Sequence, residues 1–273
     1  MFRLIKTIFV LALWAFIFFA YQFFAPDRVT FVGTGPSKAQ YDELAKHGTE
    51  VYFGSGNKVD AWFFKSPHSN KVLIYSHGLG RNVGMNADRA AALSKDVSVF
   101  AYDYRGTGRS AGTMSEPSMI DDACAAYDLL VDKYHYKPEQ IIGYGESLGT
   151  AVTAQLTTRR QLAGVIMVAS FPCWKEAAFE TAPVLIHLYP KSCWPVFDSA
   201  QALKKFKGPT LIIHGGKDEL LSVSLGKRLF QASAGSPKQF VLLPGSQHDY
   251  VIEQPEADRN LLEESVRNFV DRT

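Results

Sequence analysis

The sequence predicts an α/β fold in which helices cover both faces of a mostly parallel sheet. Short apolar runs with little polar alternation recur along the chain, which is typical of strands that are buried on both faces. Segments with helical periodicity separate these runs, and helices supply the crossover connections of a parallel sheet. The chain has 273 residues, which is enough for one domain with a sizeable core.

An antiparallel hairpin is expected first, because the apolar runs at 49–54 and 58–64 flank the turn residues Ser-Gly-Asn. The later strands are expected at KVLIYS (71–76), VSVFAY (97–102), EQIIGYG (139–145), AGVIMVAS (163–170), PTLIIHG (209–215) and KQFVLLP (238–244). The helical patterns that separate them lie near residues 84–95, 118–134, 148–159, 222–234 and 256–270.

One segment between two of these strands is too long for a plain crossover. It covers residues 171–199 and is rich in aromatic side chains, so we interpret it as an inserted lid. Phe171, Trp174 and Trp194 are its candidate substrate-binding residues, because aromatic side chains commonly line ligand grooves. Ordinary packing of these rings over the sheet is the alternative.

The N-terminus differs in kind from the rest of the chain. Residues 7–25 carry no charged side chain, and at about 1.5 Å per helical residue they span roughly 28 Å, close to a bilayer core. A cleaved signal peptide is the alternative, but the stretch is long for one and lacks a small-x-small cleavage site. We therefore expect an uncleaved membrane anchor over residues 1–28. Arg3 and Lys6 predict a cytoplasmic N-terminus and a globular domain, residues 29–273, on the extracytoplasmic side, the periplasm in a bacterium.

Composition excludes several classes of function. The chain has 29 Lys and Arg against 27 Asp and Glu, without a basic stripe interleaved with aromatic residues, so nucleic acid is not an expected partner. None of its seven histidines has the spacing to Cys or carboxylate residues that is typical of a metal site. We expect neither a metal nor a cofactor.

The pattern G-x-S-x-G places Ser147 between Gly145 and Gly149, after a predicted strand and before a predicted helix. A serine on such a sharp turn needs small neighbours, because larger side chains would collide with the adjoining backbone. The turn raises the hydroxyl above the sheet, where it can act as a nucleophile. A serine that only caps the helix is the alternative.

A serine hydroxyl becomes nucleophilic when a base accepts its proton and an acid orients that base. Asp218 and His248 follow the last two predicted strands, so both are expected at the sheet edge where open α/β sheets build their sites. The chain order Ser, Asp, His also fits this architecture. Asp103 and Asp249 are the competing carboxylates.

A tetrahedral intermediate also requires backbone N–H groups that face its negative charge. Leu79, in a glycine-containing loop after a strand, and Leu148, directly after the serine, are the expected donors. His77 and His214 each end a strand before glycine, and we interpret both as structural residues that hold loops by hydrogen bonds. Residues 101–110 are glycine-rich but lack the P-loop spacing, so we interpret them as a shaped loop under the site.

The motifs HGLGRN, DYRGTGRS, GYGESLGT, FDSAQALKKFKGPTLIIHGGKDEL and LPGSQHDY occur in an order and spacing that resembles one family. This family is the membrane-anchored α/β-hydrolase domain serine hydrolases, which include lipid-ester hydrolases, protein depalmitoylases and bacterial relatives. The resemblance covers roughly residues 48–270. It implies an α/β-hydrolase fold, a nucleophile at Ser147, an acid at Asp218, a base at His248, and an ester or thioester substrate. Leu79 departs from the H-G-N-type loop of many relatives.

The sequence thus predicts a membrane-anchored serine hydrolase of small-molecule or lipid esters. A peptidase of the prolyl-oligopeptidase kind is one alternative, although the chain has no room for the propeller of those enzymes. A non-catalytic, membrane-tethered binding module on the same fold is the other. The lid holds Cys173 and Cys193, which would form a disulfide in an oxidising compartment or remain packed thiols; Cys124 is expected to be a buried free thiol.

Overall fold

The computed structural model describes residues 33–54, 58–182, 194–248 and 254–273. The predicted anchor, the turn of the hairpin and part of the lid therefore lie outside the described residues. Within them, none of the helices combines the length and the apolar character needed to cross a bilayer.

The strands of the described chain form one eight-stranded sheet in the order β1-β2-β4-β3-β5-β6-β7-β8. Strand β2 pairs antiparallel with β1 and with β4, and all the other pairings are parallel. The strands are β1 (Thr49–Phe53), β2 (Val59–Phe64), β3 (Val72–Ser76), β4 (Ser98–Tyr102), β5 (Ile141–Glu146), β6 (Gly164–Val168), β7 (Thr210–Gly215) and β8 (Lys238–Leu243). The sequence therefore predicted all eight strands and the antiparallel hairpin.

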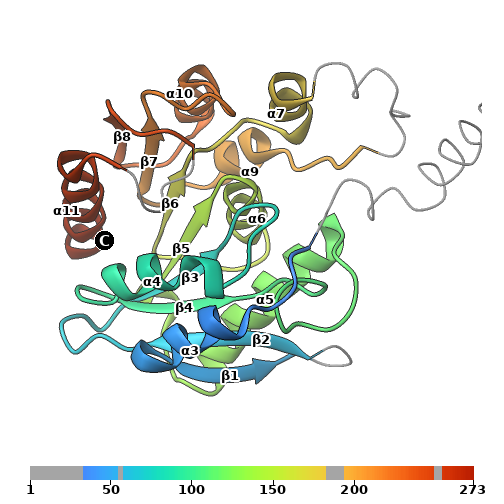
Figure 1. Ribbon diagram of the computed structural model, residues 1–273. Coiled ribbons are helices and arrows are strands. Elements are labelled where there is room, and N and C mark those ends of the chain that lie inside the picture. Colours follow the sequence, from blue (N-terminus) through green and yellow to red (C-terminus); the bar gives the residue numbers. More distant parts are fainter. Residues whose placement is uncertain (1–32, 55–57, 183–193, 249–253) are drawn as a thin grey trace, which may run out of the picture.

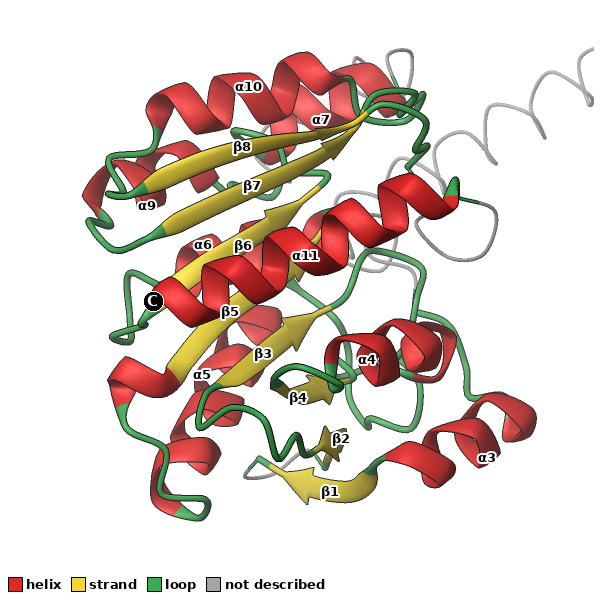
Figure 2. Cartoon of the chain, turned by 90° about the vertical axis from the view of Figure 1, so that its left-hand side faces the viewer, coloured by secondary structure: helices red, strands yellow, loops and turns green. Residues whose placement is uncertain are grey.

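Two hydrophobic clusters pack on the opposite faces of this sheet. One cluster contains residues of α5 (Glu116–Asp132), α6 (Leu148–Leu156), α7 (Trp174–Thr181), α9 (Ser199–Lys205) and α10 (Val223–Ala232). The other contains residues of α3 (Lys38–His47), α4 (Ala87–Leu93) and α11 (Glu256–Arg272). Figure 1 shows the strands running between these helices, and Figure 2 shows α11 lying across one face of the sheet. The predicted three-layer α/β fold is confirmed.

Helix α3 was not predicted from the sequence. It buries only Tyr41 and Leu44, which lie three residues apart on one helical face, and its mean hydropathy is low. Such a short amphipathic pattern is a weak signal. The helix nevertheless matters for the site, because Tyr41 reaches a buried carboxylate beneath it, as described below.

The cysteines of the described chain are thiols. Cys124 is buried on α5, as the sequence predicted. Cys173 is also a free thiol, and its Sγ lies 3.6 Å from Oε1 of Glu176. The disulfide considered for the lid is therefore not formed at Cys173; its expected partner, Cys193, lies outside the described residues.

Candidate active site

Ser147 occupies the sharp turn between β5 and α6. Its φ of 51° and ψ of −118° place it in a conformation that costs a non-glycine residue free energy. A Cβ on Gly145 would collide with the carbonyl group of Gly149, and a Cβ on Gly149 would collide with the carbonyl oxygen of Ser76. The two glycines therefore allow the turn to form, for the steric reason that the sequence indicated.

The side chains of Ser147, His248 and Asp218 form a continuous hydrogen-bonded chain. Nε2 of His248 lies 3.1 Å from Oγ of Ser147, and Nδ1 of His248 lies 2.8 Å from Oδ2 of Asp218. The three residues follow β5, β8 and β7, and Figure 2 shows these strands pointing to the same edge of the sheet. Residues up to 101 positions apart in the sequence are brought together in this way.

The carboxylate of Asp218 determines which nitrogen of the neutral His248 imidazole carries the hydrogen. A carboxylate only accepts, so Nδ1 of His248 carries the hydrogen and Nε2 is left with a free lone pair. The hydroxyl of Ser147 can then donate to Nε2. This arrangement allows the imidazole to accept the serine proton while Asp218 stabilises the resulting positive charge.

Asp218 is held in its charged form. Its side chain has no accessible surface, and burial by itself raises the pKa of a carboxyl group. Hydrogen bonds from His214 and His248 outweigh burial and hold the pKa of Asp218 well below its usual range. The second oxygen, Oδ1, also accepts the N–H groups of Leu220 and Leu221 at 3.0 and 2.8 Å.

The loop after β3 lies beside the serine. A Cβ on Gly78 would lie 3.4 Å from Cβ of Ser147, so the following N–H, that of Leu79, is close to the turn. Leu148 is the first residue of α6, and the first N–H groups of a helix have no acceptor within the helix. The structure therefore brings the loop that carries Leu79 beside the turn that carries Ser147 and Leu148.

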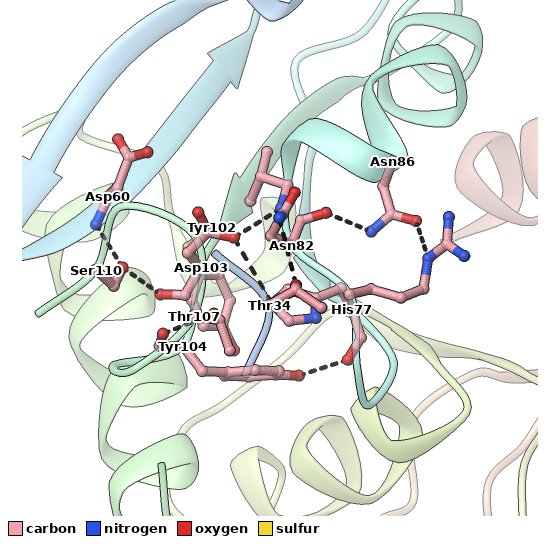
Figure 3. Close-up of polar contacts among 12 residues, drawn as sticks. Thr34, Asp60, His77, Asn82, Asn86, Tyr102, Asp103, Tyr104, Thr107 and Ser110 are labelled. Carbon is pink, nitrogen blue, oxygen red and sulfur yellow. Dashed lines mark hydrogen bonds and ion pairs between the residues drawn. The ribbon is translucent and has the colours of Figure 1, made fainter. Parts of the chain in front are cut away.

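A buried polar network supports this loop from below, as Figure 3 shows. Asp103 accepts hydrogen bonds from the N–H of Val83 and the hydroxyl of Tyr41, both at 2.6 Å. Tyr104 donates its hydroxyl to the carbonyl of His77 at 3.0 Å. His77 is buried, and its Nδ1 donates to the carbonyl of Gly78 at 2.8 Å. Asp103 thus has other partners than His248; the other competing carboxylate, Asp249, lies outside the described residues.

The sequence analysis missed a second buried cluster directly behind the serine. The carboxylate of Glu146 accepts hydrogen bonds from the hydroxyls of Tyr75 at 2.7 Å and Tyr144 at 3.0 Å, and lies 2.9 Å from the guanidinium of Arg89. A glutamate at the end of an apolar strand was the available signal. Its partner Arg89 lies 57 positions away and cannot be identified from a local pattern.

The three predicted substrate-binding residues lie in different environments. Phe171 is only 3% exposed and belongs to the hydrophobic core, so it offers little surface to a ligand. Trp174 is partly buried at the start of α7, and its ring centroid lies 6.2 Å from that of Trp194. The structure therefore brings the two tryptophans together and assigns Phe171 to packing.

Carboxylates hold the described parts of the lid segment onto the body. Glu180 of α7 accepts hydrogen bonds from the N–H and hydroxyl of Ser222, at 2.6 and 2.7 Å. Glu116 of α5 accepts the N–H groups of Val196 and Phe197 at 2.7 and 2.8 Å. No group of three His, Cys, Asp or Glu side chains in the described part of the chain has an arrangement that could hold a metal ion.

Sequence comparisons show which proteins this chain resembles. Residues 67–198 match the family described as Serine aminopeptidase, S33. Alpha/beta hydrolase domain-containing protein 17B of Xenopus tropicalis is 31% identical over 198 residues, which cover 70% of this chain and 67% of that protein. An uncharacterised protein of Mycobacterium tuberculosis is 30% identical over 258 residues, which cover 90% of this chain and 86% of that protein.

Solved structures share the fold at low sequence identity. The Pyrococcus furiosus esterase Pf2001 has a TM-score of 0.67 at 17% identity, over 89% of this chain and 97% of the esterase. A soluble variant of the monoglyceride lipase of Saccharomyces cerevisiae has a TM-score of 0.66 at 14% identity, over 82% of this chain and 94% of the lipase. Together with the relatives above, the sheet and the serine turn show that this chain is a hydrolase and belongs to the α/β-hydrolase family.

Proposed function

We propose that the protein hydrolyses carboxylic esters, including lipid esters or thioesters, through an acyl-enzyme on Ser147. The observation that carries the proposal is the hydrogen-bonded chain from Ser147 through His248 to Asp218, at 3.1 and 2.8 Å. The similarity to proteins named as an esterase and a lipase supports an ester as the substrate.

In this mechanism Oγ of Ser147 attacks the ester carbonyl while Nε2 of His248 accepts its proton. The N–H groups of Leu79 and Leu148 face the oxyanion of the tetrahedral intermediate. His248 then gives the proton to the leaving alcohol or thiol. Water attacks the acyl-enzyme by the same route, so the acid is released and Ser147 is regenerated without a cofactor.

The first test is covalent labelling by a fluorophosphonate, which reacts fast only with a base-activated hydroxyl beside an oxyanion hole. We expect stoichiometric labelling at Ser147, located by peptide mass spectrometry, and no labelling of folded Ser147→Ala. Equal labelling of the variant would refute the assignment of the nucleophile.

The second test concerns the bond that is cleaved. Because the matched family is described as a serine aminopeptidase, the competing function is peptide hydrolysis. A panel of esters, thioesters and aminoacyl amides, with Ser147→Ala as the blank, separates the two. We expect turnover of the esters or thioesters; activity confined to the amides would establish the peptidase. Folded protein that neither labels nor turns over any member would favour the non-catalytic binding module.

We further propose that residues 1–28 anchor the enzyme in a membrane and that residues 29–273 form the hydrolase domain on its extracytoplasmic side. The uncharged stretch at 7–25 and the preceding Arg3 and Lys6 support this topology. A reporter that is active only outside the cytoplasm, fused after Thr273, is expected to be active. An inactive reporter would contradict this topology and indicate that the hydrolase domain lies on the cytoplasmic side.

Anchoring would raise the effective concentration of lipid-borne substrate without changing the catalytic groups. Deletion of residues 1–28 is therefore expected to leave hydrolysis of a soluble ester nearly unchanged and to lower hydrolysis of an ester in vesicles. Equal loss on soluble and vesicle esters after the deletion would mean that the segment supports the fold instead.

The adjacent rings of Trp174 and Trp194 are the proposed binding residues for the acyl chain. Trp174→Ala and Trp194→Ala are therefore expected to lower the hydrolysis of long-chain esters more than that of short ones.

A further inference from the structure

His214, at the end of β7, lies against the carboxylate of Asp218. Its side chain has no accessible surface. Its Nε2 lies 2.9 Å from the carbonyl oxygen of Leu221 and 3.4 Å from Oδ2 of Asp218. The same Oδ2 accepts the hydrogen bond from His248. Two imidazoles therefore face one carboxylate oxygen, and only one of them also contacts the serine.

The neighbours of His214 determine its protonation. A carbonyl oxygen and a carboxylate both accept, so Nε2 must carry the hydrogen. Nδ1 is buried and has no hydrogen-bond partner among the described residues. A second proton on Nδ1 would create a buried N–H without an acceptor, which is costly. His214 is therefore a neutral donor through Nε2.

Helix α10 keeps the ring of His214 in place from the other side. A Cβ on Gly226 would collide with Nδ1 of His214. Glycine inside a helix costs about 1 kcal/mol relative to alanine, so this position sacrifices helix stability to make room for the imidazole. The ring is thus confined between Gly226 on one side and the loop of Asp218 on the other.

Within the described residues, the loop after β7 provides the hydrogen-bond donors to Asp218 other than His214 and His248. The N–H groups of Leu220 and Leu221 donate to Oδ1, and the carbonyl of Leu221 accepts from His214. The loop after β7 orients the carboxylate of Asp218, and the contact of His214 with Leu221 holds that loop in place. Without this contact, both the direction and the basicity of the carboxylate would change.

We infer that His214 is a positioning residue for the proposed triad: its neutral Nε2–H, placed between Leu221 and Asp218, keeps the carboxylate aimed at Nδ1 of His248 and moderates its basicity. The inference rests on the proposed function. It gives His214 an effect on the reaction, in addition to the purely structural role that the sequence indicated.

Loss of the donor has a predictable effect on the pH profile. A carboxylate that loses a hydrogen bond attracts the His248 proton more strongly, so the acid limb of kcat/KM moves to higher pH. Within the described residues, the titratable side chains that face Asp218 are His214, from β7, and His248, from the loop after β8. Lys217 and Glu219 flank it in the chain with exposed side chains and remain unchanged in the variants below.

The experiment compares His214→Leu, which removes the donor, with His214→Gln, whose amide N–H can restore it. We expect His214→Leu to lower kcat on a soluble ester by about 10- to 100-fold, by analogy with the loss of a partner that orients a metal ligand, with KM within about twofold. The acid limb should move to higher pH, and His214→Gln should recover most of both properties. If both variants keep the wild-type kcat and acid limb, the inference is wrong.

Leu229→Ala is the matched control, because Leu229 is buried on α10, the helix that packs against the ring of His214, and its truncation lowers stability without removing a contact to Asp218. It should lower the Tm and leave the acid limb in place; a shift equal to that of His214→Leu would assign the effect to general destabilisation. Should His214→Leu not fold, Gly226→Ala displaces the ring without deleting it and is expected to move the acid limb in the same direction. Fluorophosphonate labelling of the wild type separates the two proposals: no labelling refutes the triad, whereas normal labelling with unaffected His214 variants refutes only this inference.

Discussion

Asp218, in the loop after β7, and Asp60, on β2, both have buried carboxylates, but the environments of the two groups are opposite. Asp218 accepts hydrogen bonds at both oxygens, and its pKa lies well below its usual range. Asp60, on β2, is fully buried, and neither of its carboxylate oxygens has a partner at normal hydrogen-bond geometry within the described residues, although the indole N–H of Trp62 acts to lower its pKa. Burial, followed by the negative charges of Asp103 and Glu50, raises the pKa of Asp60 to about 7.

The difference shows that burial alone does not decide whether a carboxyl group is charged. Figure 3 shows Asp60 contacting Ser110 through its backbone nitrogen, while its carboxylate has no dashed contact. Around Asp218, the imidazole of His248 and two backbone N–H groups donate hydrogen bonds, and Nε2 of His214 lies 3.4 Å away, so these groups replace the water that would otherwise solvate the carboxylate. Asp218 keeps its charge because these groups converge on it, at the edge of the sheet that holds Ser147.

The largest expected effect is the loss of turnover when Asp218, but not Asp60, is changed to an amide. Asp218→Asn should keep the fold and lower kcat by about 10⁴-fold, because an asparagine amide favours the wrong tautomer of His248. Asp60→Asn is the matched control and should retain turnover. Ester hydrolysis and thermal melting of both variants check this, and an equal loss of activity in both would remove the functional distinction between the two sites.

The next expected effect is on stability and concerns Glu146. Its carboxylate accepts hydrogen bonds from two tyrosines and faces an arginine. Glu146→Leu removes the carboxylate that faces the largely but not fully buried Arg89 and is expected to cost about 3 to 5 kcal/mol of stability. Glu146→Gln keeps an acceptor for the tyrosine hydroxyls and should cost less. Urea unfolding measures both, and equal stability of the leucine variant and the wild type would show that the cluster does not stabilise the turn.

The smallest expected effect is the contribution of Asp60 to the pH dependence of the free energy of unfolding. Because its folded-state pKa is raised from 3.8 to about 7, the folded protein binds more protons than the unfolded chain between these values. Its contribution to stability is therefore present at low pH and is lost as the pH rises towards 7, with a slope of at most about 1.4 kcal/mol per pH unit. The stability of Asp60→Asn relative to the wild type should increase over this range. Parallel stability curves from pH 5 to 8 would contradict the assignment.

The features that the sequence predicted correctly depend on local patterns. Each buried strand is a short apolar run, and the loops after β5, β7 and β8 carry Ser147, Asp218 and His248, so the sheet edge on which they meet follows from the fold class. The glycines at 145 and 149 were identified for the same reason, since their collisions involve backbone atoms of the turn and the adjacent strand.

The features that the sequence did not predict depend on contacts between distant segments. The position of β4 between β2 and β3 is set by pairing across the sheet, which an apolar run does not specify. The pairing of Glu146 with Arg89 and the packing of Phe171 in the core likewise depend on which surfaces the folded chain brings together. Local periodicity contains no information about such partners.

The contacts of Glu180 with Ser222 and of Glu116 with Val196 and Phe197 fasten the chain on both sides of residues 183–193. Neither fastening uses a residue of the intervening stretch. None of these fastening residues belongs to the proposed triad of Ser147, His248 and Asp218. The attachment of the lid segment and the proposed chemistry therefore rest on different residues, so in evolutionary terms one can change without the other.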